Sequence, residues 1–276
     1  MKAYKGFDKN MQCRGFQYEE GKTYELPDGE EAKLCESGFH ACEAPLDCFR
    51  YYYPGNSVFH EVDLDTTEEV GSDDSKRVGR KITIGAKLDV AGIVKAQFEY
   101  TKEHCTNENH GADKSALNGG DWSALNGGDR SALNGGDWSA LNGGNRSALN
   151  GGDRSALNGG YWSALNGGYW SALNGGDRSA LNGGYGSALN GGDWSALNGG
   201  NRSALNGGNG SVIRGGIGSK FKGGKWAVFA CEVRDSDYNL TGMVTAVVDG
   251  ESIKADTWYT LKDGEFVEVN GGADND

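Results

Sequence analysis

The sequence predicts a mainly β protein built around a two-sided β-solenoid, and two observations predict it. The six residues Ser-Ala-Leu-Asn-Gly-Gly recur twelve times at intervals of eight between Ser115 and Gly208. Glycine accounts for 47 of the 276 residues and proline for only three. A strict period with so little proline argues against a disordered linker and against collagen, and it is typical of a solenoid.

Two consecutive octads form the expected coil, because eight residues are too few to enclose side chains. Each octad supplies a strand of about four residues and then a chain reversal. We expect Gly-Gly and the residue after it to reverse the chain, and Asn-Gly is a strong turn signal because both residues tolerate positive φ. A coil then has about 16 residues and adds one strand to each of two parallel sheets packed back to back. With the degenerate copies at Ser211 and Ser219, the array gives about seven coils.

The alternation of side chains along a strand predicts which residues face the interior. Leu117 and its equivalents are the only large apolar residues of the invariant set, so they point inward. Ser115 lies two residues earlier and points the same way, whereas Ala116 and Asn118 point outward. Serine hydroxyls and outward asparagines can each form hydrogen-bonded ladders from coil to coil. Because this core is thin, the ends of the solenoid need caps.

Three regions follow from the composition along the chain. Residues 1–112 predict an α+β N-terminal domain, residues 113–224 the solenoid, and residues 225–276 a β-rich C-terminal cap. A helix at about 89–104 is expected to cap the first coil. The predicted strands outside the repeats are 57–64, 81–88, 225–233 and 242–249, followed by a hairpin that turns at 262–264.

The two variable residues of each octad are the candidate binding positions. Because two octads make one coil, residues sixteen positions apart lie next to each other in neighbouring coils. The second variable residues of the octads therefore form two edges, along which aromatic rings and guanidinium groups can stack. One edge carries Trp122, Trp138, Arg154, Trp170, Gly186 and Arg202, and the other carries Arg130, Arg146, Trp162, Arg178, Trp194 and Gly210. The first variable residues form an Asp-rich row that also contains Tyr161, Tyr169 and Tyr185.

The octad in the register GGYWSALN resembles the octapeptide of bacterial ice-nucleation proteins, in which a Gly-containing turn and a Tyr precede a Ser-x-Leu/Gln-Thr strand. The resemblance covers residues 113–224 and implies a β-solenoid with inward serine ladders. It also implies aromatic ladders at an edge, which are sometimes used for dimer contact. The ice-facing Thr-x-Thr row of that family corresponds to Ala116-x-Asn118, and the array has no Thr.

The flanks KAYKGFDKNMQCRGFQYEEGKTYE, CESGFHACEAPLDCFRYY and VDGESIKADTWYTLKDGEFVEV are similar to those of an uncharacterised family of phage and gut-bacterial repeat proteins. That family carries an N-terminal domain of unknown function, and the similarity implies a phage or bacterial origin without an activity. The first residues lack an apolar signal segment, and no stretch approaches eighteen apolar residues. We therefore expect a cytoplasmic protein with reduced cysteines and no membrane partner.

The N-terminal region offers two chemical hypotheses. Cys35, His40, Cys42 and Cys48 lie close in sequence, but their spacing is irregular compared with the paired cysteines of zinc sites, so we expect no metal and no cofactor. The order YKGF, GFHACEAPLDCFRYY, FHEVDL looks like the skeleton of ADP-ribosyltransferase-like domains. That resemblance implies an NAD-binding platform and a catalytic Glu, with His40 and Glu61 as the matching positions.

The favoured function is that of a non-enzymatic structural and binding protein. Its edge ladders would mediate self-association or bind a protein or glycan. Nucleic acid is disfavoured, because the net charge is −12 and the repeats hold five arginines against six aspartates. One alternative is an ice-interacting solenoid that uses the flat Ala-x-Asn face. The other is an ADP-ribosyltransferase-like N-terminal enzyme with the solenoid as a spacer.

Overall fold

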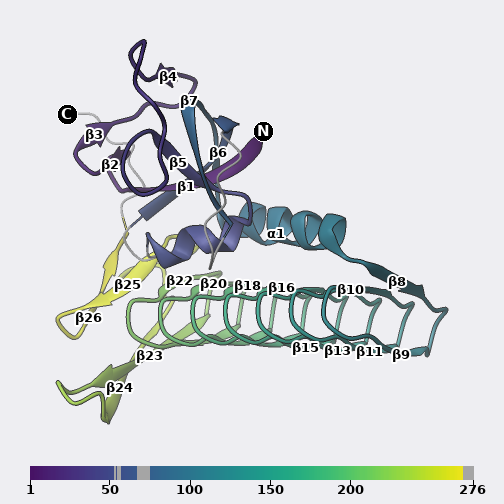
Figure 1. Ribbon diagram of the computed structural model, residues 1–276. Helices are drawn as coiled ribbons and strands as arrows, with labels where there is room; N and C mark the ends of the chain where they lie inside the picture. The colour runs from purple at the N-terminus through teal and green to yellow at the C-terminus, as the bar shows by residue number, and fades with distance from the viewer. Residues whose placement is uncertain (53, 55–56, 67–74, 270–276) are drawn as a thin grey trace. The chain divides into compact units, whose positions relative to one another are not determined.

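The computed structural model describes residues 1–52, 54, 57–66 and 75–269 (Figure 1). The chain divides into two compact units. The first comprises residues 1–52 and the described residues among 57–89, and the second comprises residue 54 and residues 90–269. The helix predicted at 89–104 is therefore part of the second unit, together with the solenoid.

The first unit is a small antiparallel sheet that closes on itself. Strand β7 pairs with β5 through residues 76–79 and with β6 from residue 79 onward, so β5, β1, β6 and β7 form a ring. Phe7, Val62 and Ile82 lie fully buried in its interior. Both predicted strands are confirmed, and the second starts earlier than expected. The elements are β1 (Lys2–Asp8), β2 (Gln12–Cys13), β3 (Phe16–Gln17), β4 (Thr23–Glu25), β5 (Phe39–Cys42), the 3₁₀ helix η1 (Pro45–Arg50), β6 (Ser57–Thr66) and β7 (Lys76–Leu88).

The second unit contains the predicted solenoid, with two parallel sheets and about eight turns between residues 107 and 231. It has one turn more than expected, because one strand before the first octad, β8, and one strand after the last octad, β23, join the stack. One sheet contains β8 (Asn107–His110), β10 (Ser123–Asn126), β12 (Ala140–Asn142), β14 (Ala156–Asn158), β16 (Ala172–Asn174), β18 (Ala188–Asn190), β20 (Ala204–Gly207) and β22 (Lys220–Gly223). The other contains β9 (Ala116–Asn118), β11 (Ala132–Asn134), β13 (Ala148–Asn150), β15 (Ala164–Asn166), β17 (Ala180–Asn182), β19 (Ala196–Asn198), β21 (Val212–Gly215) and β23 (Val228–Arg234).

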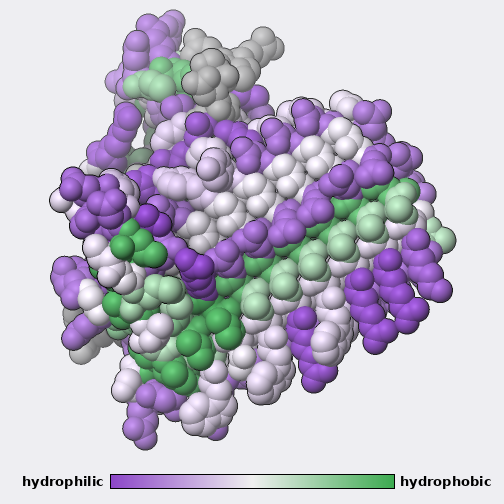
Figure 2. Space-filling view, turned by 90° about the horizontal axis from the view of Figure 1, so that it is seen from below, coloured by the Kyte–Doolittle hydropathy of each residue, from purple (hydrophilic) through white to green (hydrophobic). Residues whose placement is uncertain are grey.

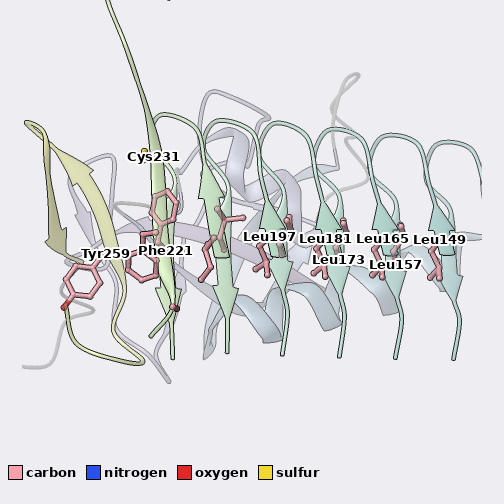
Figure 3. Close-up of a cluster of buried hydrophobic side chains, with 14 of the residues drawn as sticks. Leu149, Leu157, Leu165, Leu173, Leu181, Leu197, Phe221, Cys231 and Tyr259 are labelled. Atoms are coloured by element: carbon pink, nitrogen blue, oxygen red, sulfur yellow. The ribbon is translucent and has the colours of Figure 1, made fainter. Parts of the chain in front are cut away.

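The register of two octads per coil and the predicted facing are both confirmed. Leu125 pairs with Leu141, and the leucines form a buried file between the sheets that ends on Phe221 and Tyr259 (Figure 3). The inward serines are buried as well, but they bridge backbone groups instead of forming a hydroxyl ladder. The Ser139 hydroxyl, for example, donates to the carbonyl of Gly120 in the preceding coil at 3.2 Å. Each buried hydroxyl is thus paired with a backbone group, as a thin core requires.

The positive φ of the chain reversal does not fall on the residues that we expected. The residue with positive φ is the second variable residue, with φ of 56° at Trp122 and 60° at Arg130, and not Asn or either Gly. The two glycines are needed for space instead. A Cβ on Gly127 would come within 2.7 Å of the Ser131 Cβ, and one on Gly128 would clash with an Asp113 carboxylate oxygen.

Helix α1 (Val90–His104) lies along one sheet of the solenoid rather than across the end of the first coil. It contacts β12, β14, β16, β18 and β20, which are successive strands of that sheet. Its buried positions include Val90, Ile93 and Val94, and they face a row of alanines small enough to admit a helix. Ala156 beneath it is fully buried, whereas Ala148 on the opposite sheet is exposed.

The C-terminal strands cap the last coil, as predicted. Strand β24 (Leu240–Val247) pairs antiparallel with β23. The predicted hairpin consists of β25 (Tyr259–Lys262) and β26 (Glu265–Glu268), and its turn residues Asp263 and Gly264 both have positive φ. Rings from Phe221, Phe229 and Phe266 pack 5.5–5.7 Å apart and close the end of the leucine file.

Candidate binding edges of the solenoid

The second variable residues form two edges, as the sixteen-residue period of the sequence predicted. Each edge is longer than expected. The first edge is Trp122, Trp138, Arg154, Trp170, Gly186, Arg202 and Gly218; the second edge is Lys114, Arg130, Arg146, Trp162, Arg178, Trp194, Gly210 and Trp226. All fifteen residues have positive φ, yet only three are glycine. A side chain in this conformation costs about 1–2 kcal/mol. The Trp and Arg side chains therefore occupy positions at which the backbone favours glycine.

The first edge is a nearly continuous stack. The rings of Trp122 and Trp138 lie 4.8 Å apart and within 4° of parallel. The Arg154 guanidinium follows at 4.7 Å from Trp138 and 5.5 Å from Trp170. Further along, Arg202 covers the Tyr185 ring and donates a hydrogen bond to its hydroxyl. These side chains are half-buried, so the first edge is occupied largely by its own contacts.

The second edge is open to solvent. Trp162 and Trp194 are 56% and 66% exposed, and the arginines between and before them are exposed too. Arg178 lies 5.0 Å from the Trp162 ring. Within the described part of the chain, neither Arg130 nor Arg146 forms an ion pair. A polar groove of about 440 Å³ runs beside them, between Asp113 and Trp162.

The first variable residues have a structural role that the sequence analysis missed. The Asp121 carboxylate accepts the backbone N–H of Asp137 in the next coil at 2.9 Å, and Asn145 accepts that of Tyr161 in the same way. This hydrogen bond, from a backbone N–H of one coil to a side-chain oxygen of the preceding coil, is called the bracket below. It joins neighbouring coils, which explains why Asp and Asn dominate the position. Tyr161 and Tyr169 lack such an oxygen and are exposed instead. The signal was present in the sequence, since Asp and Asn share the acceptor that the bracket needs.

The two Ala-x-Asn faces of the solenoid differ in what covers them. On both faces the asparagines form ladders, as from Asn158 to Asn142 and from Asn198 to Asn182, each at 2.8 Å. Helix α1 covers the first of these faces. The second stays exposed, and Figure 2 shows its apolar strip beside a hydrophilic row. Among the described residues, this is the Ala-x-Asn face that helix α1 does not cover.

The candidate residues of the N-terminal unit lie in separate places. His40 lines a cavity, and its Nε2 accepts the backbone N–H of Cys35 at 2.9 Å. Burial lowers the pKa of His40, as do the charges of Lys5 and Lys76, so its ring is neutral near pH 7. Glu61 does not line that cavity and is ion-paired with Lys2 at 2.9 Å. Cys42 and Cys48 are buried and Cys35 is exposed, and none of the three forms a disulfide with another described residue.

Residues 1–96 match the family model of a domain of unknown function, DUF7666. No curated protein and no solved structure matches the chain. The matched segment covers the first unit and the start of helix α1, and it brings no activity with it. In the described residues, no helix has the length and apolar character needed to span a bilayer.

Proposed function

We propose that the protein is a non-enzymatic scaffold whose solenoid associates with a second copy of itself along the second edge. The observation that supports this most strongly is the open Trp and Arg side chains of that edge. They are held at positions where glycine would relieve backbone strain, and they make few contacts within their own chain. Strain of this kind clusters where a side chain is needed for recognition.

The order of residues along the second edge favours an antiparallel dimer. We place a twofold axis between the coil of Trp162 and the coil of Arg178, so that residues at equal distances on opposite sides of the axis face one another across the two copies. Every cation then faces an aromatic ring or a glycine, and none faces another cation. The facing pairs are Lys114 with Trp226, Arg130 with Gly210, Arg146 with Trp194, and Trp162 with Arg178.

The first variable residues are complementary in the same register. The facing pairs are Asp113 with Lys225, Asp129 with Asn209, Asn145 with Asp193, and Tyr161 with Asp177. Moving the axis by one coil in one direction places Arg130 opposite Arg178, and in the other direction Asp177 opposite Asp193. Like charges in contact are unfavourable, so the central register is preferred. The first edge could also pair without like charges, but its side chains already stack on one another.

Sedimentation velocity of the full chain over a range of concentrations tests this proposal. The variant with Trp162→Gly and Trp194→Gly removes two rings, while its glycines suit the positive φ at both sites. We expect the parent to dimerise at micromolar concentration and this variant to dimerise at least tenfold more weakly. The matched control, Trp122→Gly with Trp170→Gly on the first edge, should still dimerise.

A monomeric parent at every concentration would contradict self-association, and an open edge would then serve a different partner, such as a glycan. Equal weakening by the control would contradict the choice of edge. The register is tested separately by the photo-crosslinking substitution Trp194→p-benzoylphenylalanine. Its crosslinks should fall near Arg146 of the second copy, whereas crosslinks near residue 194 itself would contradict the antiparallel register.

A further inference from the structure

The first unit contains a cavity of about 660 Å³ with aromatic walls. Phe16, Tyr18, Tyr24 and Phe39 line it and pack edge to face, with ring centroids 4.8 Å apart for Phe16 and Tyr18 and 5.4 Å apart for Phe16 and Tyr24. Burial raises the pKa of Tyr18, so its phenol stays neutral. A cavity of this size, with apolar walls and a few polar groups, is typical of a small-molecule site.

A buried ammonium group lies in the wall of this cavity. Lys5 on β1 is only 6% exposed, and its Nζ donates to the carbonyl of His40 at 2.7 Å. The same Nζ lies 5.6 Å from the ring centroids of Phe7 and Tyr18. None of the ion pairs among the described residues includes Lys5. An ammonium has three N–H groups, and a buried charge without an opposite charge is costly, so an anion entering the cavity would stabilise it.

Further cations lie around the same cavity. Lys76 lines it with its Nζ 4.9 Å from the Tyr51 ring, and Arg14 lines it from a positive-φ position. The two carboxylates of the lining are Glu25, which is already paired with Lys81 at 3.3 Å, and Glu36. The three cations therefore outnumber the carboxylates.

We propose that this cavity binds a small organic anion that carries a flat ring. The ring would lie among the aromatic side chains, and the anionic group would lie against Lys5, with Arg14 and Lys76 nearby. A mononucleotide and an aromatic carboxylate share this chemistry. A cationic ring does not fit it, because the lining is itself cationic. The site therefore differs from an NAD site that places a charged nicotinamide here, and it is independent of the solenoid edges.

Calorimetric titration of the full chain with chosen probes tests the site. The ring-bearing anions are adenosine monophosphate and indole-3-carboxylate, and the comparison probes are adenosine, inorganic phosphate and NAD. We expect at least one ring-bearing anion to bind at least tenfold more tightly than every comparison probe. Whichever anion binds identifies the source of the shared chemistry. Equal binding of adenosine, tighter binding of NAD, or no binding by either ring-bearing anion would overturn the proposal.

Variants locate the site within the cavity. Lys5→Met should weaken the bound anion at least tenfold, and the exposed control Lys87→Met, which lies outside the lining, should leave its affinity unchanged. If Lys5→Met does not fold, Arg14→Asn provides the second variant, since Asn tolerates the positive φ at that position. It should weaken the anion at least threefold. Unchanged affinity in a folded Lys5→Met, or in Arg14→Asn where that variant replaces it, would overturn the proposal.

Discussion

The two edges of the solenoid are built from the same residue types in the same backbone conformation, yet they differ in what the side chains contact. On the first edge, Trp122, Trp138 and Arg154 stack on one another and are half-buried. On the second edge, Trp194 and Arg146 extend into solvent. The order of residues contributes to this difference, because two of the three tryptophans of the first edge, Trp122 and Trp138, occupy neighbouring coils. The same octad thus produces one edge whose side chains stack on one another and one edge whose side chains stay exposed.

The two sheets differ in the same way. The alanine row of the β10–β22 sheet lies under helix α1, whereas the alanine row of the β9–β21 sheet is exposed. Both rows come from the same octad, so the difference arises outside the repeat.

The largest expected effect tests the contrast between the sheets. Ala156→Glu places a carboxylate beneath helix α1 at a fully buried position, and Ala164→Glu places the same group on the exposed sheet. Burying an unpaired charge costs several kcal/mol, so we expect Ala156→Glu to lower the free energy of unfolding by about 3 kcal/mol or more. Ala164→Glu should change it by less than about 0.5 kcal/mol. Urea denaturation measures both, and equal losses would show that the helix does not cover this sheet.

The sequence was enough to predict the coil, its register and its core, because these follow from the period and from the single leucine of each octad. The positive φ was assigned to the wrong residues because Asn-Gly is a strong turn signal in hairpins. In this array the glycines are needed for close packing, and Trp or Arg takes the positive φ. The position of helix α1 could not be predicted, since identical octads offer it two identical alanine rows.

The candidate site was predictable only in part. The spacing of two octads placed Trp138 beside Arg154, and that contact is observed. It did not show which edge stays open, because this depends on contacts with residues outside the repeat, such as Tyr100 near Trp138. The cavity of the first unit was not foreseen. It brings together Lys5, Arg14 and Lys76, which no short motif connects.

A smaller effect on the free energy of unfolding, opposite in sign for the two edges, tests whether the side chains of the first edge stabilise the fold while those of the second do not. Trp138→Gly removes a half-buried ring with two stacking partners, so despite the relief of strain we expect the free energy of unfolding to fall by about 1–2 kcal/mol. Trp194→Gly removes an exposed ring and relieves the same positive φ, so we expect no loss and a gain of up to about 1 kcal/mol. Urea denaturation of dilute, monomeric samples compares the two. A loss for Trp194→Gly as large as for Trp138→Gly would mean that both edges are structural.

The smallest effect concerns the bracket, which should not distinguish the edges at all. Asp121 on the first edge and Asp129 on the second each accept one backbone N–H from the next coil, at 2.9 and 2.8 Å. Removing either oxygen leaves a backbone donor less well paired, so Asp121→Ala and Asp129→Ala should each cost about 1 kcal/mol. Asp121→Asn and Asp129→Asn keep the acceptor and should cost almost nothing. Urea denaturation with hydrogen exchange at the Asp137 and Asn145 amides measures both pairs. A cost on only one edge would mean that the edges already differ in their backbone, and the contrast between them could no longer be assigned to the Trp and Arg side chains.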